Sequence, residues 1–219
     1  MNNLMPYLYS FLYLIPAVVI SLTVHEYFHA LVATRLGDPT PRQEGRLSLN
    51  PVHHIDPLGF LVMLLVRFGW AKPVRVNPMY FQNPKKGMMY TAIAGPASNL
   101  LLCILSSLLL FFSNVLHFPS FFISFFLYMT LLNIGLAVFN LIPIFPLDGS
   151  RIVSYFAPGY ASFMARNGQY VQLIFMALLI LPGFIPGIPD VFGMVIGTVQ
   201  QGAVSALYRL WSLLFGFLL

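Results

Sequence analysis

The chain has 219 residues, of which 58% are hydrophobic and only 8% are charged. An ordinary soluble domain carries roughly 25% charged residues, so this composition excludes a soluble globular protein. Disordered chains combine low hydrophobicity with high charge, and the mean hydropathy of +0.82 excludes that class as well. The sequence therefore predicts an integral membrane protein surrounded by the lipid bilayer.

The formal net charge of +5 comes from 11 lysines and arginines set against 6 acidic residues. The basic residues lie in loops between apolar runs and are not clustered with interleaved aromatics, so we expect no nucleic-acid partner. The single cysteine, Cys103, lies in an apolar run and allows no intrachain disulfide. No basic residue precedes the first apolar run, so a removable signal peptide is not expected.

Apolar runs long enough to cross a membrane recur along the chain. A hydrocarbon core of about 30 Å requires about 20 apolar residues in a helix. Four runs meet this length, at residues 4–33, 88–112, 121–142 and 191–218, and a shorter run with a proline near its end covers 170–184. We expect an all-α multi-pass membrane protein with about five transmembrane helices, in which residues 1–219 form a single membrane-embedded domain.

Residues 57–70 form a shorter apolar run, interrupted by Arg67. If this run crossed the membrane, the basic loops 35–46 and 72–86 would lie on opposite sides, against the positive-inside rule. A re-entrant element over about residues 57–80 keeps both loops on the cytoplasmic side. Irregular backbone at membrane depth requires protein or a water-filled cavity beside it, so a cavity is expected here.

The remaining connections complete the predicted topology. Residues 113–120 and 186–190 contain no lysine or arginine. Under the positive-inside rule we expect both connections, and the N-terminus, on the outer side of the membrane.

The first apolar run contains His25, Glu26 and His29 in the pattern H-E-x-x-H. Helical residues four apart lie on one face, so both imidazoles can reach one metal ion. Glu26 lies beside them, where its carboxylate can take a proton from a water molecule and pass it to a leaving amine. Zinc accepts imidazole and carboxylate ligands and keeps one position open in catalytic sites. The pattern predicts a catalytic zinc site.

Chance is a poor explanation of this pattern. Random placement of the chain's histidines and glutamates predicts about 0.001 occurrences. The alternative is two core histidines and a hydrogen-bonded carboxylate. Three ionisable groups in an apolar helix are costly unless they share a purpose, which favours the metal site.

A third ligand is needed, and the candidates are Asp148, His54, Asp56 and Glu44. Asp148 follows the run 121–142 at its predicted cytoplasmic exit, at the depth of the histidine pair. The surrounding prolines and glycine indicate irregular backbone that lines a cavity. An aspartate at a helix exit is also a common cap, so the residues alone leave the third ligand open.

Three motifs in order resemble the site-2 protease family of intramembrane zinc metalloproteases. They are the H-E-x-x-H at 25–29, Gly-Pro-Ala-Ser-Asn at 95–99, and the segment from Asn140 to Gly149 with Pro143, Pro146 and Asp148. No PDZ-like or CBS-like stretch accompanies them, so the resemblance is to a minimal form. Residues 69–78 resemble the family's re-entrant β-like loop. Phe28 and Ser150 differ from common members, in which small residues and a second glycine are frequent at these positions.

The resemblance implies one Zn²⁺ per chain, held by His25, His29 and Asp148, with Glu26 as the catalytic acid and base. It implies hydrolysis of peptide bonds in or near transmembrane segments of membrane-protein substrates, as in regulated intramembrane proteolysis. We expect the cytoplasmic membrane of a prokaryote, and the positive-inside rule puts the active site towards the cytoplasm. The oligomeric state does not follow from these motifs.

Four further polar residues are weaker candidates. Asn99 and Asn140 can hydrogen-bond an extended substrate, although either could equally join two helices. His54 and Asp56 can orient a metal ligand, although hydrogen bonds within a loop explain them as well.

Two other functions compete with proteolysis. A metal-ion transporter also needs buried histidines and carboxylates, but it does not need Glu26, and no inverted repeat is visible. An inactive scaffold that binds transmembrane helices needs no metal chemistry at all.

Overall fold

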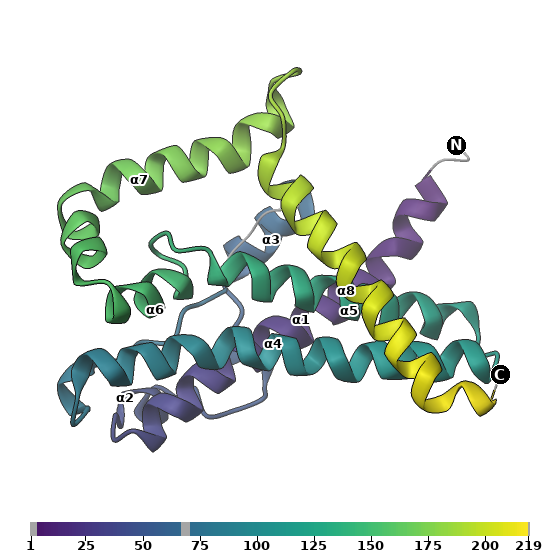
Figure 1. Cartoon of the computed structure of the whole chain (residues 1–219), viewed down its shortest axis with the longest axis horizontal. Helices are drawn as coiled ribbons and strands as arrows, with labels where there is room; N and C mark the ends of the chain where they lie inside the picture. The colour runs from purple at the N-terminus through teal and green to yellow at the C-terminus, as the bar shows by residue number, and fades with distance from the viewer. Residues whose placement is uncertain (1–3, 67–70, 219) are drawn as a thin grey trace.

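The computed structural model describes residues 4–66 and 71–218. The helices are α1 (Leu4–Arg35), α2 (Thr40–Gln43), α3 (Pro57–Val66), α4 (Pro84–Val115), α5 (Ser120–Leu141), α6 (Asp148–Phe156), α7 (Pro158–Phe184) and α8 (Val191–Phe215), with short 3₁₀ turns at Pro51–His53 (η1), Pro78–Tyr80 (η2) and Gly216–Leu218 (η3) (Figure 1). No β-strand occurs in the described ranges.

Within the described residues, five helices are long and apolar enough to cross a membrane: Phe11–Arg35 within α1, and the whole of α4, α5, α7 and α8. This confirms the prediction of an all-α multi-pass membrane protein. Helix α7 begins at Pro158, earlier than the predicted start at residue 170. The polar stretch 166–169 interrupts its hydrophobic run, although the helix continues through it.

Helices α1, α4 and α5 pack on one another and form the core. Small residues at their contacts, such as Ala30, Ala92 and Ala137, are fully buried and allow close approach of the helices. Helix α8 packs across α4 and α5 (Figure 1). The Trp211 indole N–H donates to Ser107 Oγ (3.0 Å), and the Gln200 amide donates to the Leu131 carbonyl (2.8 Å).

The position of α8 corrects one expectation. Phe215, at the far end of α8, packs on Phe111 and Phe112 near the α4–α5 connection. Near the start of α8, Phe192 packs on Phe175 of α7, which also contacts Phe139 near the end of α5. The expectation that connections 113–120 and 186–190 lie at the same end is therefore wrong. Figure 1 shows the α7–α8 connection projecting from the side of the bundle. Aromatic packing determines the course of α8, and the lack of basic residues in a loop does not.

The segments that precede and follow α3 lie side by side. Ile55 and Ala71 form an antiparallel bridge, and the Lys72 N–H donates to the His54 carbonyl (2.8 Å). Helix α3 has 10 residues, which span about 15 Å and cannot cross a core of about 30 Å. Both features agree with a re-entrant element. Residues 67–70, which also belong to that prediction, lie outside the described residues.

Candidate active site

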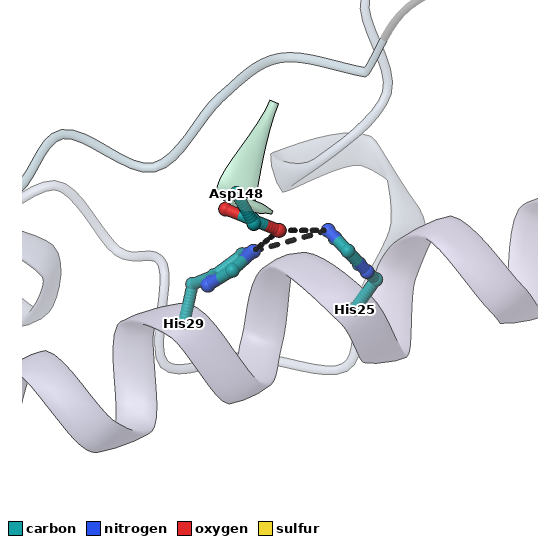
Figure 2. Close-up of side chains that lie close together, drawn as sticks. All are labelled: His25, His29 and Asp148. Carbon is teal, nitrogen blue, oxygen red and sulfur yellow. Dashed lines mark hydrogen bonds and ion pairs between the residues drawn. The ribbon is translucent and has the colours of Figure 1, made fainter. Parts of the chain in front are cut away.

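The structure brings His25, His29 and Asp148 together in one buried cluster (Figure 2). The Nε2 atoms of the two histidines are 3.0 Å apart. Asp148 Oδ2 lies 3.5 Å from His25 Nε2 and 3.2 Å from His29 Nε2. Figure 2 shows the two imidazoles projecting from adjacent turns of α1 towards the carboxylate, which approaches from the start of α6.

Local structure delivers Asp148 to this point. Helix α5 ends at Leu141, residues 142–147 are irregular and contain two prolines, and α6 begins at Asp148 itself. Gly149 lies so close to the Leu141 carbonyl that a side chain at this position would overlap it. The glycine therefore allows α6 to start against the end of α5, with the Asp148 carboxylate directed at the histidines.

The cluster fits a cation. Asp148 Oδ2 is buried and accepts no hydrogen bond. His29 Nδ1 lies 2.7 Å from the Thr91 carbonyl. A carbonyl only accepts, so this nitrogen carries the ring proton and Nε2 presents a lone pair. A buried acceptor without a donor is costly, and a metal ion would satisfy both atoms.

The spacing and surroundings fit zinc. Tetrahedral zinc with bonds of about 2.0–2.2 Å places neighbouring ligand atoms about 3.3–3.5 Å apart, close to the separations of 3.0, 3.2 and 3.5 Å found here. A methyl group on Gly95 of α4 would overlap both imidazoles. Glycine at this position leaves space beside the imidazole rings for an ion. Two imidazoles and one carboxylate form a three-ligand set typical of catalytic zinc sites.

Glu26 lies beside the cluster at the wall of a small cavity. Its Oε2 accepts a hydrogen bond from the Val74 N–H (3.0 Å), and the residue is 8% exposed. The cavity has a volume of about 130 Å³. Its lining comes from the site helices and from the extended segment 71–77: His25, Glu26, His29, Pro73, Val74, Val76, Thr91, Asn140, Pro146, Asp148 and Arg151. A carboxylate fixed at one oxygen beside three candidate metal ligands can move a proton in the cavity.

Two buried charged residues hold segment 71–77 in place, and neither was predicted from the sequence. Arg46, 3% exposed, donates to the carbonyls of Lys72 and Pro73 (3.1 Å each). Asp38, fully buried, accepts from the Asn77 N–H (2.7 Å) and the Thr40 N–H (2.9 Å). The only signal in the sequence was the scarcity of charge: in a chain with so few charged residues, each one is expected to have a specific role.

The four weaker candidates occupy different surroundings. Asn140 lines the cavity, and its amide donates to the Leu136 carbonyl (3.0 Å). Asn99 is fully buried, and its Oδ1 lies 2.6 Å from His25 Nδ1, so the structure places it behind a candidate ligand. His54 Nε2 donates to the Ser48 carbonyl (2.6 Å), and Asp56 accepts from Gly59 N at the start of α3 (2.8 Å). Neither His54 nor Asp56 is among the residues of the cluster or its cavity.

Sequence comparisons place the chain among known proteins. The family model for peptidase family M50 matches residues 113–182. "Putative zinc metalloprotease YwhC" of Bacillus subtilis strain 168 is 37% identical over 177 residues, which cover 78% of this chain and 81% of that protein. "Putative zinc metalloprotease Rip2" of Mycolicibacterium smegmatis is 31% identical over 185 residues, which cover 80% of this chain and 70% of that protein.

A more distant relative, the Rip2 protein of Mycobacterium tuberculosis strain H37Rv, is 26% identical over 94% of this chain and 83% of its own length. No solved structure matches the chain. The identity to YwhC over most of both chains agrees with the histidine and aspartate cluster and with the membrane-spanning helices. The chain belongs to peptidase family M50, the site-2 protease family, and is a membrane zinc metalloprotease.

Proposed function

We propose that this protease hydrolyses peptide bonds within or next to transmembrane segments of membrane-protein substrates. The supporting observation is the location of the cluster: both histidines lie in the apolar span Phe11–Arg35 of α1, and both are at most 8% exposed. A soluble peptide has no reason to meet a site at this depth, whereas a transmembrane segment does.

The cleavage position lies near the cytoplasmic face. At about 1.5 Å per residue, His29 and His25 lie about 9 and 15 Å before Arg35 at the end of α1. Basic residues gather at this end of the molecule: Arg35, Arg42, Arg46, Lys72, Arg75, Lys85, Lys86 and Arg151. The positive-inside rule assigns such an end to the cytoplasm. The three relatives described above come from bacteria, which supports a prokaryotic cell membrane.

His25, His29 and Asp148 hold the zinc ion. When bound, zinc acts as a Lewis acid on the scissile carbonyl and makes water a usable nucleophile at neutral pH. Glu26 takes the proton from the attacking water and gives it to the leaving amine. Its hydrogen bond to the Val74 N–H keeps one carboxylate oxygen in place while the other remains for this transfer.

The substrate must be unwound before water can reach its backbone. Each backbone group freed in lipid costs several kcal/mol, so the enzyme has to supply hydrogen-bond partners. Asn140 and segment 71–77 line the cavity and offer side-chain and backbone groups to an extended chain. Cleavage therefore combines local unwinding with hydrolysis in one cavity.

The test compares wild type, Glu26→Gln and Glu44→Gln on a single-span substrate reconstituted with the full chain in liposomes. In Glu26→Gln the new amide oxygen still accepts from the Val74 N–H but cannot take up a proton, so cleavage falls by about 10²- to 10⁴-fold while zinc content is unchanged. Glu44 pairs at 3.6 Å with an Arg75 side chain that is 83% exposed. Such a surface pair is worth little, so Glu44→Gln keeps the activity.

The fragments' masses locate the cut. Cleavage inside or beside the span supports the proposal, whereas cleavage confined to distant soluble regions contradicts it. Equal cleavage by Glu26→Gln contradicts the role of Glu26. Zinc flux into the liposomes without any cleavage would favour a transporter.

A further inference from the structure

We propose that Asn99 is a positioning residue that holds His25 in the Nδ1–H tautomer through a directed chain of hydrogen bonds across three helices. The chain runs from His25 of α1 through Asn99 of α4 and Asn133 of α5 back to Ser21 of α1. This inference deepens the proposed zinc site, on which it rests, and does not depend on the substrate.

Main-chain carbonyls at one end of this network determine which atoms donate and which accept. The Asn133 side chain lies 2.8 Å from the Met129 carbonyl and 2.8 Å from Ser21 Oγ. Ser21 Oγ lies 2.7 Å from the Ala17 carbonyl. Carbonyls only accept, so the Ser21 hydroxyl donates to Ala17 and the Asn133 NH₂ faces Met129 and Ser21.

The remaining hydrogen bonds of this network can then be oriented in only one way. With its NH₂ engaged, Asn133 presents Oδ1 to Asn99 at 2.8 Å, so Asn99 donates through its own NH₂. Asn99 Oδ1 therefore faces His25 Nδ1 at 2.6 Å and requires a donor there. His25 carries its proton on Nδ1, and its Nε2 is left with a lone pair directed at the metal cluster.

Because these side chains are buried, the hydrogen bonds cannot adopt another orientation without a large cost. Ser21, Asn99 and Asn133 are fully buried and His25 is 5% exposed. Reversing any one amide would bring two acceptors or two donors face to face, at a cost of one or more unsatisfied buried groups. The helices α4 and α5 thus determine which nitrogen of a residue on α1 is available to zinc.

Partners behind a zinc-ligating histidine fix its tautomer and orientation, and their loss typically weakens metal affinity by about 10- to 100-fold. The tautomer of His29 is fixed in the same way by a main-chain carbonyl, that of Thr91. His25 has a side chain as partner, so here the contribution can be altered by mutation.

The test measures zinc affinity of the detergent-solubilised full chain by competition with a chelator. Asn99→Leu keeps the volume but offers no acceptor, so zinc affinity should fall by about 10- to 100-fold. Asn99→Asp still accepts from His25 Nδ1 but loses the donor to Asn133 Oδ1, so it should lose clearly less zinc affinity than Asn99→Leu. The matched control is Ser106→Ala, which removes another buried α4–α5 hydrogen bond, between Ser106 Oγ and Thr130 Oγ1 (3.0 Å), with no link to His25. Its zinc affinity should stay at the wild-type value.

A second measurement does not need a variant that folds. Nitrogen-15 NMR of the metal-free wild type, labelled at histidine, should show His25 as the Nδ1–H tautomer at neutral to basic pH. An Nε2–H ring at His25 would overturn the proposal. So would unchanged affinity in Asn99→Leu, or equal losses in Asn99→Leu and in Asn99→Asp or Ser106→Ala. None of these readouts involves proteolysis, so a failure of the proposed substrate class would leave them interpretable.

Discussion

The Glu26 carboxylate accepts a hydrogen bond of 3.0 Å from the backbone N–H of Val74, a residue 48 positions away. This bond joins the proposed proton carrier to the extended segment 71–77, which Arg46 and Asp38 hold from the other side. The orientation of Glu26 therefore depends on a loop outside its own helix.

Replacing Val74 by proline removes the N–H and should lower kcat by about 10-fold or more, because a hydrogen bond to a charged group contributes about 1.5–3 kcal/mol. Zinc content should not change, since no ligand is touched. Val74→Ala keeps the amide and should lose far less activity. Steady-state cleavage assays check the difference, and equal losses in the two variants would refute the role of the N–H.

Replacing Asp148 by alanine should weaken zinc binding by more than about 100-fold, beyond the loss expected for an outer hydrogen-bond partner. His54→Ala and Asp56→Ala should keep the metal, because both side chains serve loop hydrogen bonds. Metal analysis of the purified variants checks this. Full zinc occupancy in Asp148→Ala, with loss in either of the others, would move the third ligand to the loop.

Replacing Gly95 by alanine should displace both imidazoles and abolish tight zinc binding, because the added methyl group overlaps them. Gly202 of α8 has open space around it, so Gly202→Ala should bind zinc normally. It should also raise stability by about 0.5–1 kcal/mol, the usual gain for alanine over glycine inside a helix. Thermal unfolding and zinc titration of both variants test this, and normal zinc binding by Gly95→Ala would contradict it.

Acid should destabilise the loop that contains His54. Burial lowers the pKa of His54 below its usual 6.5, so the folded ring stays neutral where the unfolded ring is already protonated. Stability is therefore complete above about pH 6.5 and declines as the pH falls towards the lower folded pKa. His54→Gln should lose less stability between pH 7.5 and 5.5 than wild type. Equal acid sensitivity in the two proteins would contradict the shift.

The sides of the membrane can be tested in a cysteine-free Cys103→Ser chain. A membrane-impermeant maleimide added to intact cells should label His117→Cys, in the α4–α5 connection, and leave Lys85→Cys unlabelled. Phe217→Cys, beyond the end of α8, should behave like His117→Cys, since that end packs near the α4–α5 connection. Labelling of Phe217→Cys only after cell lysis would instead favour the topology drawn from loop charges alone.

Sequence patterns predicted the membrane class, the helices of the core and the proximity of H-E-x-x-H to Asp148. These features have local signals: apolar length, a four-residue spacing, and motifs of fixed order. The start of α7 and the whole of α6 were missed because their polar residues break the hydrophobic run that identifies a span.

Long-range polar contacts could not be predicted. Asn99 was weighed as a substrate or helix partner, and nothing in one sequence shows that it lies behind His25. Asp38 and Arg46 looked like loop charges, although they are buried against segment 71–77. Such contacts depend on how helices and loops are placed relative to one another, which no local pattern encodes.

The two histidines of the cluster stand on one continuous helix, whereas Asp148 stands at the head of α6, after an irregular connection. Zinc would thus cross-link the first helix of the chain to its C-terminal arm of α6 and α7. A chelator should accordingly release amide protection in α6 before it affects α1, α4 and α5, which pack together without it. The ion would then stabilise the tertiary structure reversibly, in addition to its role in catalysis.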